Sequence, residues 1–92
     1  MSITRINEFQ SAPGKEEELF LFLNSILPYI ASSEGAISCE VLRHAENKSS
    51  FVVIEKWQSI EAHKQSVSQF PKEKMQAAMS LFGLPPKGAY YA

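Results

Sequence analysis

Two neighbouring segments rich in β-branched and aromatic residues constrain the fold of this chain more than any other feature. They are AISCEVLRH, residues 36–44, and SFVVIEKW, residues 50–57. The polar residues 45–49 between them favour a turn, so we expect a β-hairpin. Side chains alternate between the two faces of a strand. Because residues 51–54 are all apolar, this hairpin presents apolar groups on both of its faces.

Patterns before the hairpin predict a strand and a long helix. Residues 2–10 alternate loosely and favour a strand, which Pro13 and Gly14 follow as chain-breaking residues. Residues 15–33 carry three glutamates in their first turn, followed by apolar residues at three- and four-residue spacing. We expect one helix over this range, kinked at Pro28.

Patterns after the hairpin predict two shorter helical segments and a last strand. Ser59 is suited to cap a helix that runs to about residue 68, and Pro71 is suited to begin a second one. Four apolar residues are expected to share one side of this second helix: Met75, Ala78, Met79 and Phe82. Gly83 is expected to end it, with 84–86 as an extended connector and 87–92 as an edge strand.

The predicted order of elements is strand, helix, strand, strand, helix, strand. This is the βαββαβ order of the ferredoxin-like α+β fold, in which one antiparallel sheet carries the helices on one face. The 92 residues suit a single domain over 1–92.

Helices on one face leave apolar side chains of the other face in water. In the second hairpin strand we expect Val52 and Ile54 to point away from Phe51, Val53 and Trp57. In the first, we expect Leu42 to point away from Ile37, Cys39 and Val41. Burying one large apolar side chain contributes roughly 1.5–3 kcal/mol, out of a net stability of ~5–15 kcal/mol for a small domain. We therefore expect a homodimer that packs two sheets face to face.

Charge and cysteine content exclude several classes of protein. Nine basic and ten acidic side chains give a net charge of −1, without the clustered positive charge that a nucleic-acid or membrane-surface protein needs. The single cysteine, Cys39, cannot form an internal disulfide, and no spacing resembles a zinc site. No apolar stretch is long enough for a membrane span or a signal peptide, so we expect a cytoplasmic location.

Several of these segments together resemble the antibiotic biosynthesis monooxygenase (ABM) family. They are Asn7 in the first strand, Pro13-Gly14-Lys15, Glu34-Gly35 and FVVIEKWQSIEA at 51–62, and the resemblance covers nearly the whole chain. It implies a dimeric α+β barrel with a pocket between sheet and helices in each protomer. Several relatives oxidise phenolic or quinol substrates with O2 and without metal or flavin. Others degrade haem, isomerise small metabolites or have no known reaction.

The chain departs from the family pattern at two places. Relatives commonly carry a histidine nine residues after the tryptophan, where this chain has Ser66. The haem-degrading branch needs an axial histidine further along, where this chain offers Met75 and Met79. The resemblance therefore disfavours haem degradation, and we expect neither metal nor cofactor.

His63 and Asn7 are the candidate catalytic residues. His63 shares a helical stripe with Ile60 and Val67 and lies one turn before Ser66, so its ring is expected to face the sheet or the pocket. A histidine can act as general base on a phenol, although an inert histidine between helix and sheet fits the same pattern. Asn7 in mid-strand could hold a substrate oxygen or O2, or could lie at a bulge in solvent.

The remaining candidates are expected to contact substrate. Trp57 and Phe22 offer aromatic contact, although a lone tryptophan more often belongs to a core or a dimer interface. Glu55 is either a desolvated acid or base or, more in keeping with its type, part of a salt bridge at the dimer seam. Ser66 and Met79 complete the predicted substrate-binding set, Met79 being equally suited to the core.

The leading hypothesis is a cofactor-independent monooxygenase that acts on a small phenolic or quinol-type aromatic. Its reaction comes from the resemblance alone, since fold does not fix function. Two alternatives stay open. One is an isomerase that moves protons with His63 and Glu55, and the other is a non-enzymatic dimer that binds a small ligand.

Overall fold

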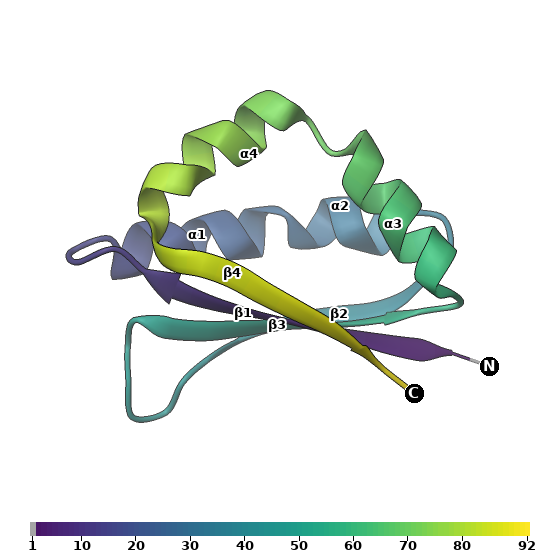
Figure 1. The fold of residues 1–92 in the computed structure, drawn as a ribbon, viewed down its shortest axis with the longest axis horizontal. Helices are drawn as coiled ribbons and strands as arrows, with labels where there is room; N and C mark the ends of the chain where they lie inside the picture. Colours follow the sequence, from purple (N-terminus) through teal and green to yellow (C-terminus); the bar gives the residue numbers. More distant parts are fainter. Residues whose placement is uncertain (1) are drawn as a thin grey trace.

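The computed structural model describes residues 2–92, in which one layer of helices covers one face of a single sheet (Figure 1). The elements, in chain order, are β1 (Ile3–Ser11), α1 (Glu16–Ser25), α2 (Leu27–Ser32), β2 (Ala36–Arg43), β3 (Ser50–Trp57), α3 (Ile60–Gln69), α4 (Lys72–Ala78), the 3-10 helix η1 (Met79–Leu81) and β4 (Phe82–Tyr91). The strands are antiparallel and lie in the order β2-β3-β1-β4. This confirms the predicted ferredoxin-like α+β fold.

The helix expected over residues 15–33 is two helices rather than one kinked helix. α1 ends at Ser25, and Ile26 caps both α1 and α2. Pro28 lies in the first turn of α2. Proline is tolerated there because the first N–H groups of a helix have no partner within it, whereas in a helix interior it would remove a hydrogen bond.

The start of α3 is fixed by its cap and by a glycine that packs against it. Ser59 Oγ accepts a hydrogen bond from the Ala62 N–H at 3.1 Å, which confirms the predicted cap. Gly35, just before β2, has φ +86°, and a Cβ at this position would lie 2.6 Å from the Ala62 Cβ. Only glycine adopts this conformation readily and leaves room for the helix. The first turn of α3 is thereby held against the end of β3.

The end of the chain differs from the prediction. Phe82 and Gly83 belong to β4 rather than to a helix, and Pro85 and Pro86 lie within this strand rather than in a connector. β4 is an edge strand that pairs only with β1, and its register shifts between Glu8 and Gln10 of that strand. Edge positions and bulges are where a strand accepts proline, because no ladder hydrogen bond is lost there.

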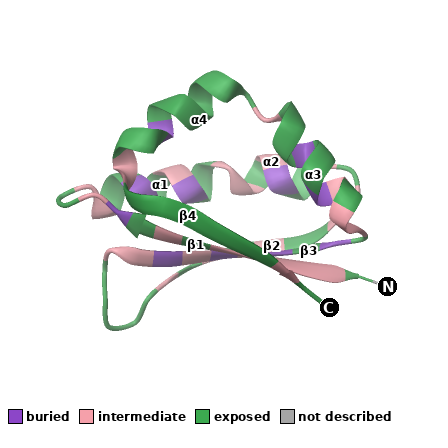
Figure 2. Ribbon diagram, in the orientation of Figure 1, coloured by how far each residue is buried: buried purple, intermediate pink, exposed green. Residues whose placement is uncertain are grey.

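The core lies between α1 and the centre of the sheet. Leu19 and Leu23 of α1 pack on Phe51 and Val53 of β3, and all four are at most 1% exposed. Figure 2 shows buried segments in β3 and in the helices that lie over the sheet. Met75 and Met79 are not part of this core, since they are 42% and 62% exposed.

The face of the sheet opposite the helices carries the apolar residues that were expected there. Val52 and Ile54 alternate with buried residues along β3, as predicted. Leu42 on the same face is 46% exposed. Ile37, expected to point the same way as Cys39 and Val41, lies where the register of β2 shifts between Ala36 and Ser38, and it is 54% exposed whereas the other two are half-buried. A β-bulge of this kind redirects the side chains around it.

The described residues include no helix with the length and apolar character that a membrane crossing requires.

Candidate active site

A buried carboxylate at the end of β3 is the centre of a polar network under the helices. Glu55 follows Phe51 and Val53 at two-residue spacing, so its side chain points toward the helices, where it is 5% exposed. Its Oε1 accepts a hydrogen bond from Trp57 Nε1 at 2.9 Å, and its Oε2 accepts one from Asn7 Nδ2 at 3.0 Å. Buried charges need such donors, so these contacts hold the carboxylate in one orientation.

His63 lies directly over this carboxylate, in the first turn of α3. Its ring is packed edge-on against the Trp57 indole, with 5.6 Å between the ring centroids. Its Nε2 is 3.8 Å from Glu55 Oε1, and its Nδ1 is 2.7 Å from the Tyr90 hydroxyl oxygen. Since Nε2 faces an acceptor, we place the ring proton on Nε2, so that Nδ1 accepts the hydrogen bond from the Tyr90 O–H.

The environment of the network keeps this imidazole uncharged. Burial, and then the positive charge of Arg5, lower the pKa of His63 to about 4. Burial raises the pKa of Glu55, against the opposing effects of the Trp57 N–H, Arg5 and Asn7. The approach of His63 to Glu55 is therefore not an ion pair at neutral pH. At neutral pH the imidazole is unprotonated, so its Nδ1 is free to accept a hydrogen bond or a proton.

β1 contributes an arginine and an amide that extend the network toward β4. Arg5 Nε donates to Asn7 Oδ1 at 2.9 Å, so the Asn7 amide connects the guanidinium to Glu55. The Arg5 guanidinium also lies over the Tyr90 ring, 4.6 Å from its centroid. Gly88 of β4 pairs with Asn7, and a Cβ at this position would overlap the guanidinium and lie 2.5 Å from Asn7 Oδ1. The glycine is needed for this arrangement.

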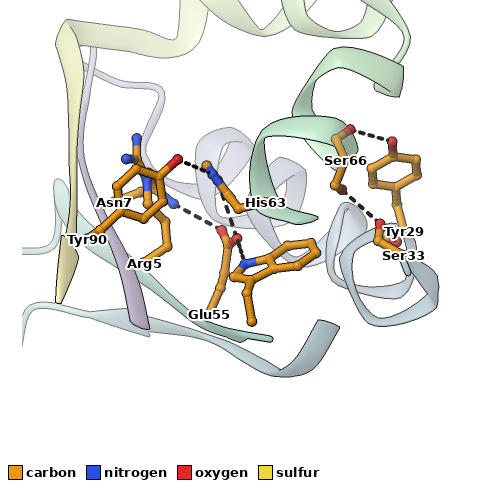
Figure 3. A network of polar contacts seen from close by, with 9 residues as sticks. Arg5, Asn7, Tyr29, Ser33, Glu55, His63, Ser66 and Tyr90 are labelled. Carbon is orange, nitrogen blue, oxygen red and sulfur yellow. Dashed lines mark hydrogen bonds and ion pairs between the residues drawn. The ribbon is translucent and has the colours of Figure 1, made fainter. Parts of the chain in front are cut away.

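Figure 3 shows these residues converging from β1, β3, β4 and α3. Glu55 and His63 are nearly inaccessible, whereas Arg5, Asn7 and Tyr90 are partly exposed. The accessible part of the network therefore lies on its β1–β4 side, where the Tyr90 hydroxyl contacts His63.

The structure brings together four of the seven predicted site residues: Asn7, Glu55, Trp57 and His63. Trp57 is only 1% exposed. Its N–H donates to Glu55, and its ring packs against the His63 ring. Ser66 is buried one turn further along α3 and turns away from His63 (Figure 3): its Oγ contacts Ser33 Oγ at 2.8 Å, and its carbonyl accepts a hydrogen bond from Tyr29.

Phe22 and Met79 also lie outside the network. Phe22 packs at the margin of the core between α1 and the sheet, and Met79 is exposed in η1. Two hollows on the surface do not contain the network either. One, of about 480 Å³, lies on the uncovered face of the sheet beside Leu42, Val52 and Leu84. The other, of about 300 Å³, lies between Gly35 and α3.

Sequence reasoning missed Arg5 and Tyr90. Arg5 could have been found, because it lies two residues before Asn7 in a predicted strand and must share its face. Tyr90 could not, because its register against β1 depends on the irregular pairing of β4. Within residues 2–92, His, Cys, Asp and Glu do not gather in a group of three that could hold a metal ion.

A family model described as "Antibiotic biosynthesis monooxygenase" matches residues 2–79 of this chain. Curated protein sequences gave no match.

Solved structures are similar over almost the whole chain. A mutant of SnoaB from Streptomyces nogalater, a cofactor-independent oxygenase, has a TM-score of 0.84 at 17% identity, covering 99% of this chain and 91% of its own. A conserved protein from Methanosarcina mazei Go1 has a TM-score of 0.88 at 20% identity, with coverages of 99% and 91%. At such identities the likeness shows the fold.

Proposed function

Because the chain belongs to the antibiotic biosynthesis monooxygenase family, we propose that it oxidises a small phenolic or quinol-type aromatic with O2, without metal or organic cofactor. The observation that carries the proposal is the series of contacts from the buried Glu55 through His63 to the partly exposed Tyr90 hydroxyl. The similarity to the fold of SnoaB, a cofactor-independent oxygenase, supports the choice of O2 chemistry.

The protein's task in this reaction is to remove a proton. A phenol that donates its O–H to Tyr90 passes a proton to the Tyr90 oxygen, while the proton of Tyr90 moves to His63 Nδ1. Glu55 then faces the imidazolium, which its negative charge stabilises. The resulting phenolate is electron-rich and transfers electrons directly to O2, so acid–base chemistry is all that the side chains supply.

The proposed oxidation balances without a further reductant. A phenol with a free para carbon loses its O–H and para C–H hydrogens and gains one oxygen atom at that carbon, giving a quinone. The second atom of O2 leaves as water with the two hydrogens. Four electrons pass from substrate to O2, and the proton on His63 is returned to the water that forms.

The other candidate residues position these groups. The second N–H of the Asn7 amide makes no hydrogen bond within the described part of the chain, and we assign it to the substrate oxygen or to O2. Trp57 fixes Glu55 and His63. We still predict that substrate contacts Phe22, Ser66 and Met79. A structure with a bound ligand would test these contacts.

Oxygen uptake with a panel of hydroquinones and phenols tests the proposal. We expect consumption by the wild-type protein and its loss in His63→Gln, which keeps the size of the side chain and removes the base. His44→Gln is the matched control, since His44 lies in the exposed β2–β3 connection, outside the network, and its Nδ1 accepts a hydrogen bond from the Glu46 N–H. Uptake that survives in His63→Gln would disprove the assigned role.

An isomerase is a second candidate, favoured by one specific observation. His63 Nε2 and Glu55 Oε1 lie 3.8 Å apart, so two acid–base groups face the same buried space. An isomerase would exchange substrate protons with D2O without consuming oxygen. Binding without either activity would indicate a ligand-binding protein.

We also propose that the uncovered sheet face joins two copies of the chain. Ile54 pairs with Ile6 at the centre of this face, and Val52 pairs with Leu42 beside them. Sedimentation at micromolar concentration should give twice the chain's 10.3 kDa. Ile54→Glu should dissociate the dimer, whereas Leu21→Glu, on the exposed side of α1, should not. A monomeric wild-type protein would refute the interface.

A further inference from the structure

Arg5 and Arg43 both lie on the covered face of the sheet, but only Arg43 forms an ion pair with a described residue. Arg5 pairs across the ladder with Glu55, and Arg43 pairs with Phe51, so both share the face that carries the helices. Both guanidinium groups lie over aromatic rings. Arg43 also forms an ion pair with Glu17 at 2.9 Å, whereas Arg5 forms no ion pair with the described residues.

Arg5 is nevertheless held in a fixed position. Its Nε is occupied by Asn7 Oδ1, its plane lies over the Tyr90 ring, and Gly88 leaves the space that it fills. The carboxylate of Glu55 is the nearest potential counter-charge in the network, but its two oxygens accept from Trp57 and Asn7. The Arg5 guanidinium is therefore held in place without an ion pair in direct contact among the described residues, and the Glu55 carboxylate acts on it only at longer range.

We propose that the Arg5 guanidinium is a binding subsite for an anionic oxygen on an aromatic ligand, a phenolate or a carboxylate. Guanidinium groups bind such oxygens through charge-assisted hydrogen bonds, which are about twice as strong as neutral ones. The subsite lies beside the Tyr90 hydroxyl, where the ligand meets the proton path. The aromatic nature of the ligand rests on the proposed function, whereas the need for an anion rests on Arg5 itself.

The subsite also couples ligand binding to the base. The charge of Arg5 is one of the two causes that lower the pKa of His63. An anion bound to Arg5 offsets this charge, so His63 becomes a stronger base when the ligand is in place. The same guanidinium stabilises the phenolate that forms when the proton leaves.

One matched pair of probes and one phenol whose ionisation is visible test the subsite without turnover. Benzoate and benzamide have the same shape and differ in charge. 4-Nitrophenol has a phenolate that absorbs visible light and an acid form that does not, so its absorbance reports which form is bound. Binding is followed by amide chemical shifts in the wild-type protein, in Arg5→Met and in Arg43→Met. Well-dispersed amide signals from each variant without ligand serve as the check that the variant is folded.

We expect benzoate to bind the wild-type protein at least about tenfold more tightly than benzamide, the factor that loss of one charge-assisted bond gives. Arg5→Met should abolish this preference, and Arg43→Met should keep it. Bound 4-nitrophenol should be more ionised than free 4-nitrophenol at the same pH, and benzoate should raise the pKa of His63.

The absence of any preference for the anionic form with either probe, or a preference that Arg5→Met retains, would overturn the proposal. A preference for nitrophenolate alone would identify the ligand oxygen as phenolic, and one for benzoate alone would identify a carboxylate. Failure of oxygen uptake would count against the proposed reaction and not against the subsite, since these probes require no oxidation.

Discussion

Neutral His63 makes the protein's stability depend on pH in a specific window. Its pKa is about 4 in the folded protein and 6.5 in an unfolded chain. Between these values the unfolded chain binds the proton and the folded protein does not, so stability falls as the pH falls. The groups that face His63 are the Glu55 carboxylate, the Tyr90 hydroxyl and, through its charge, Arg5.

The size of this effect follows from the two pKa values. One pH unit inside the window changes the free energy of unfolding by about 1.4 kcal/mol per proton. From pH 7 to pH 5 the contribution of His63 should therefore fall by about 2 kcal/mol, because the window opens only near pH 6.5. Glu55 acts in the opposite sense, since its raised pKa favours the folded state as the pH falls.

Urea denaturation of wild type and His63→Gln at pH 7 and pH 5 isolates this contribution, since Glu55 is present in both. At equal protein concentration, the wild-type protein should lose about 2 kcal/mol more than the variant, and His44→Gln should behave as wild type. NMR titration of the His63 ring should give the low pKa directly. Equal losses in both proteins, with His63 titrating near pH 6.5, would refute a buried neutral imidazole.

Substitutions at three further positions test the contacts of the network and the cap of α3. Glu55→Met should lower the free energy of unfolding by about 1–3 kcal/mol because it leaves the buried Trp57 N–H without an acceptor, and Glu55→Gln should cost less; urea midpoints measure both. Gly88→Ala should displace Arg5, weaken benzoate binding and destabilise by about 1–3 kcal/mol, and a binding isotherm equal to wild type would contradict the packing. Ser59→Ala should cost about 1 kcal/mol through loss of the α3 cap, measured as a shift in Tm.

The fold could be predicted because its local signals agree with one another. The hairpin composition, the Ser59 cap and the apolar spacing in α1 all lead to the same βαββαβ order. The errors lie where tertiary pairing overrides local preference. Pro85 and Pro86 indicated a connector, but an irregular edge strand accepts them.

The sequence predicted the central residues of the network but not Arg5 or Tyr90. His63 and Glu55 follow from helical and strand periodicity, which place both side chains between helix and sheet. The contact of Tyr90 with His63 depends on the register between β1 and β4, which one sequence does not specify when bulges interrupt it. Trp57 was expected either to contact substrate or to belong to the core or a dimer interface; its side chain is 1% exposed and its N–H donates to Glu55.

The location of a bound phenol tests the central claim most directly. In a crystal structure with 4-nitrophenol, the phenol oxygen should lie about 3 Å from the Tyr90 hydroxyl and from a terminal nitrogen of Arg5. A ring bound instead in the hollow beside Leu42 and Val52, on the uncovered face of the sheet, would contradict the assigned proton path.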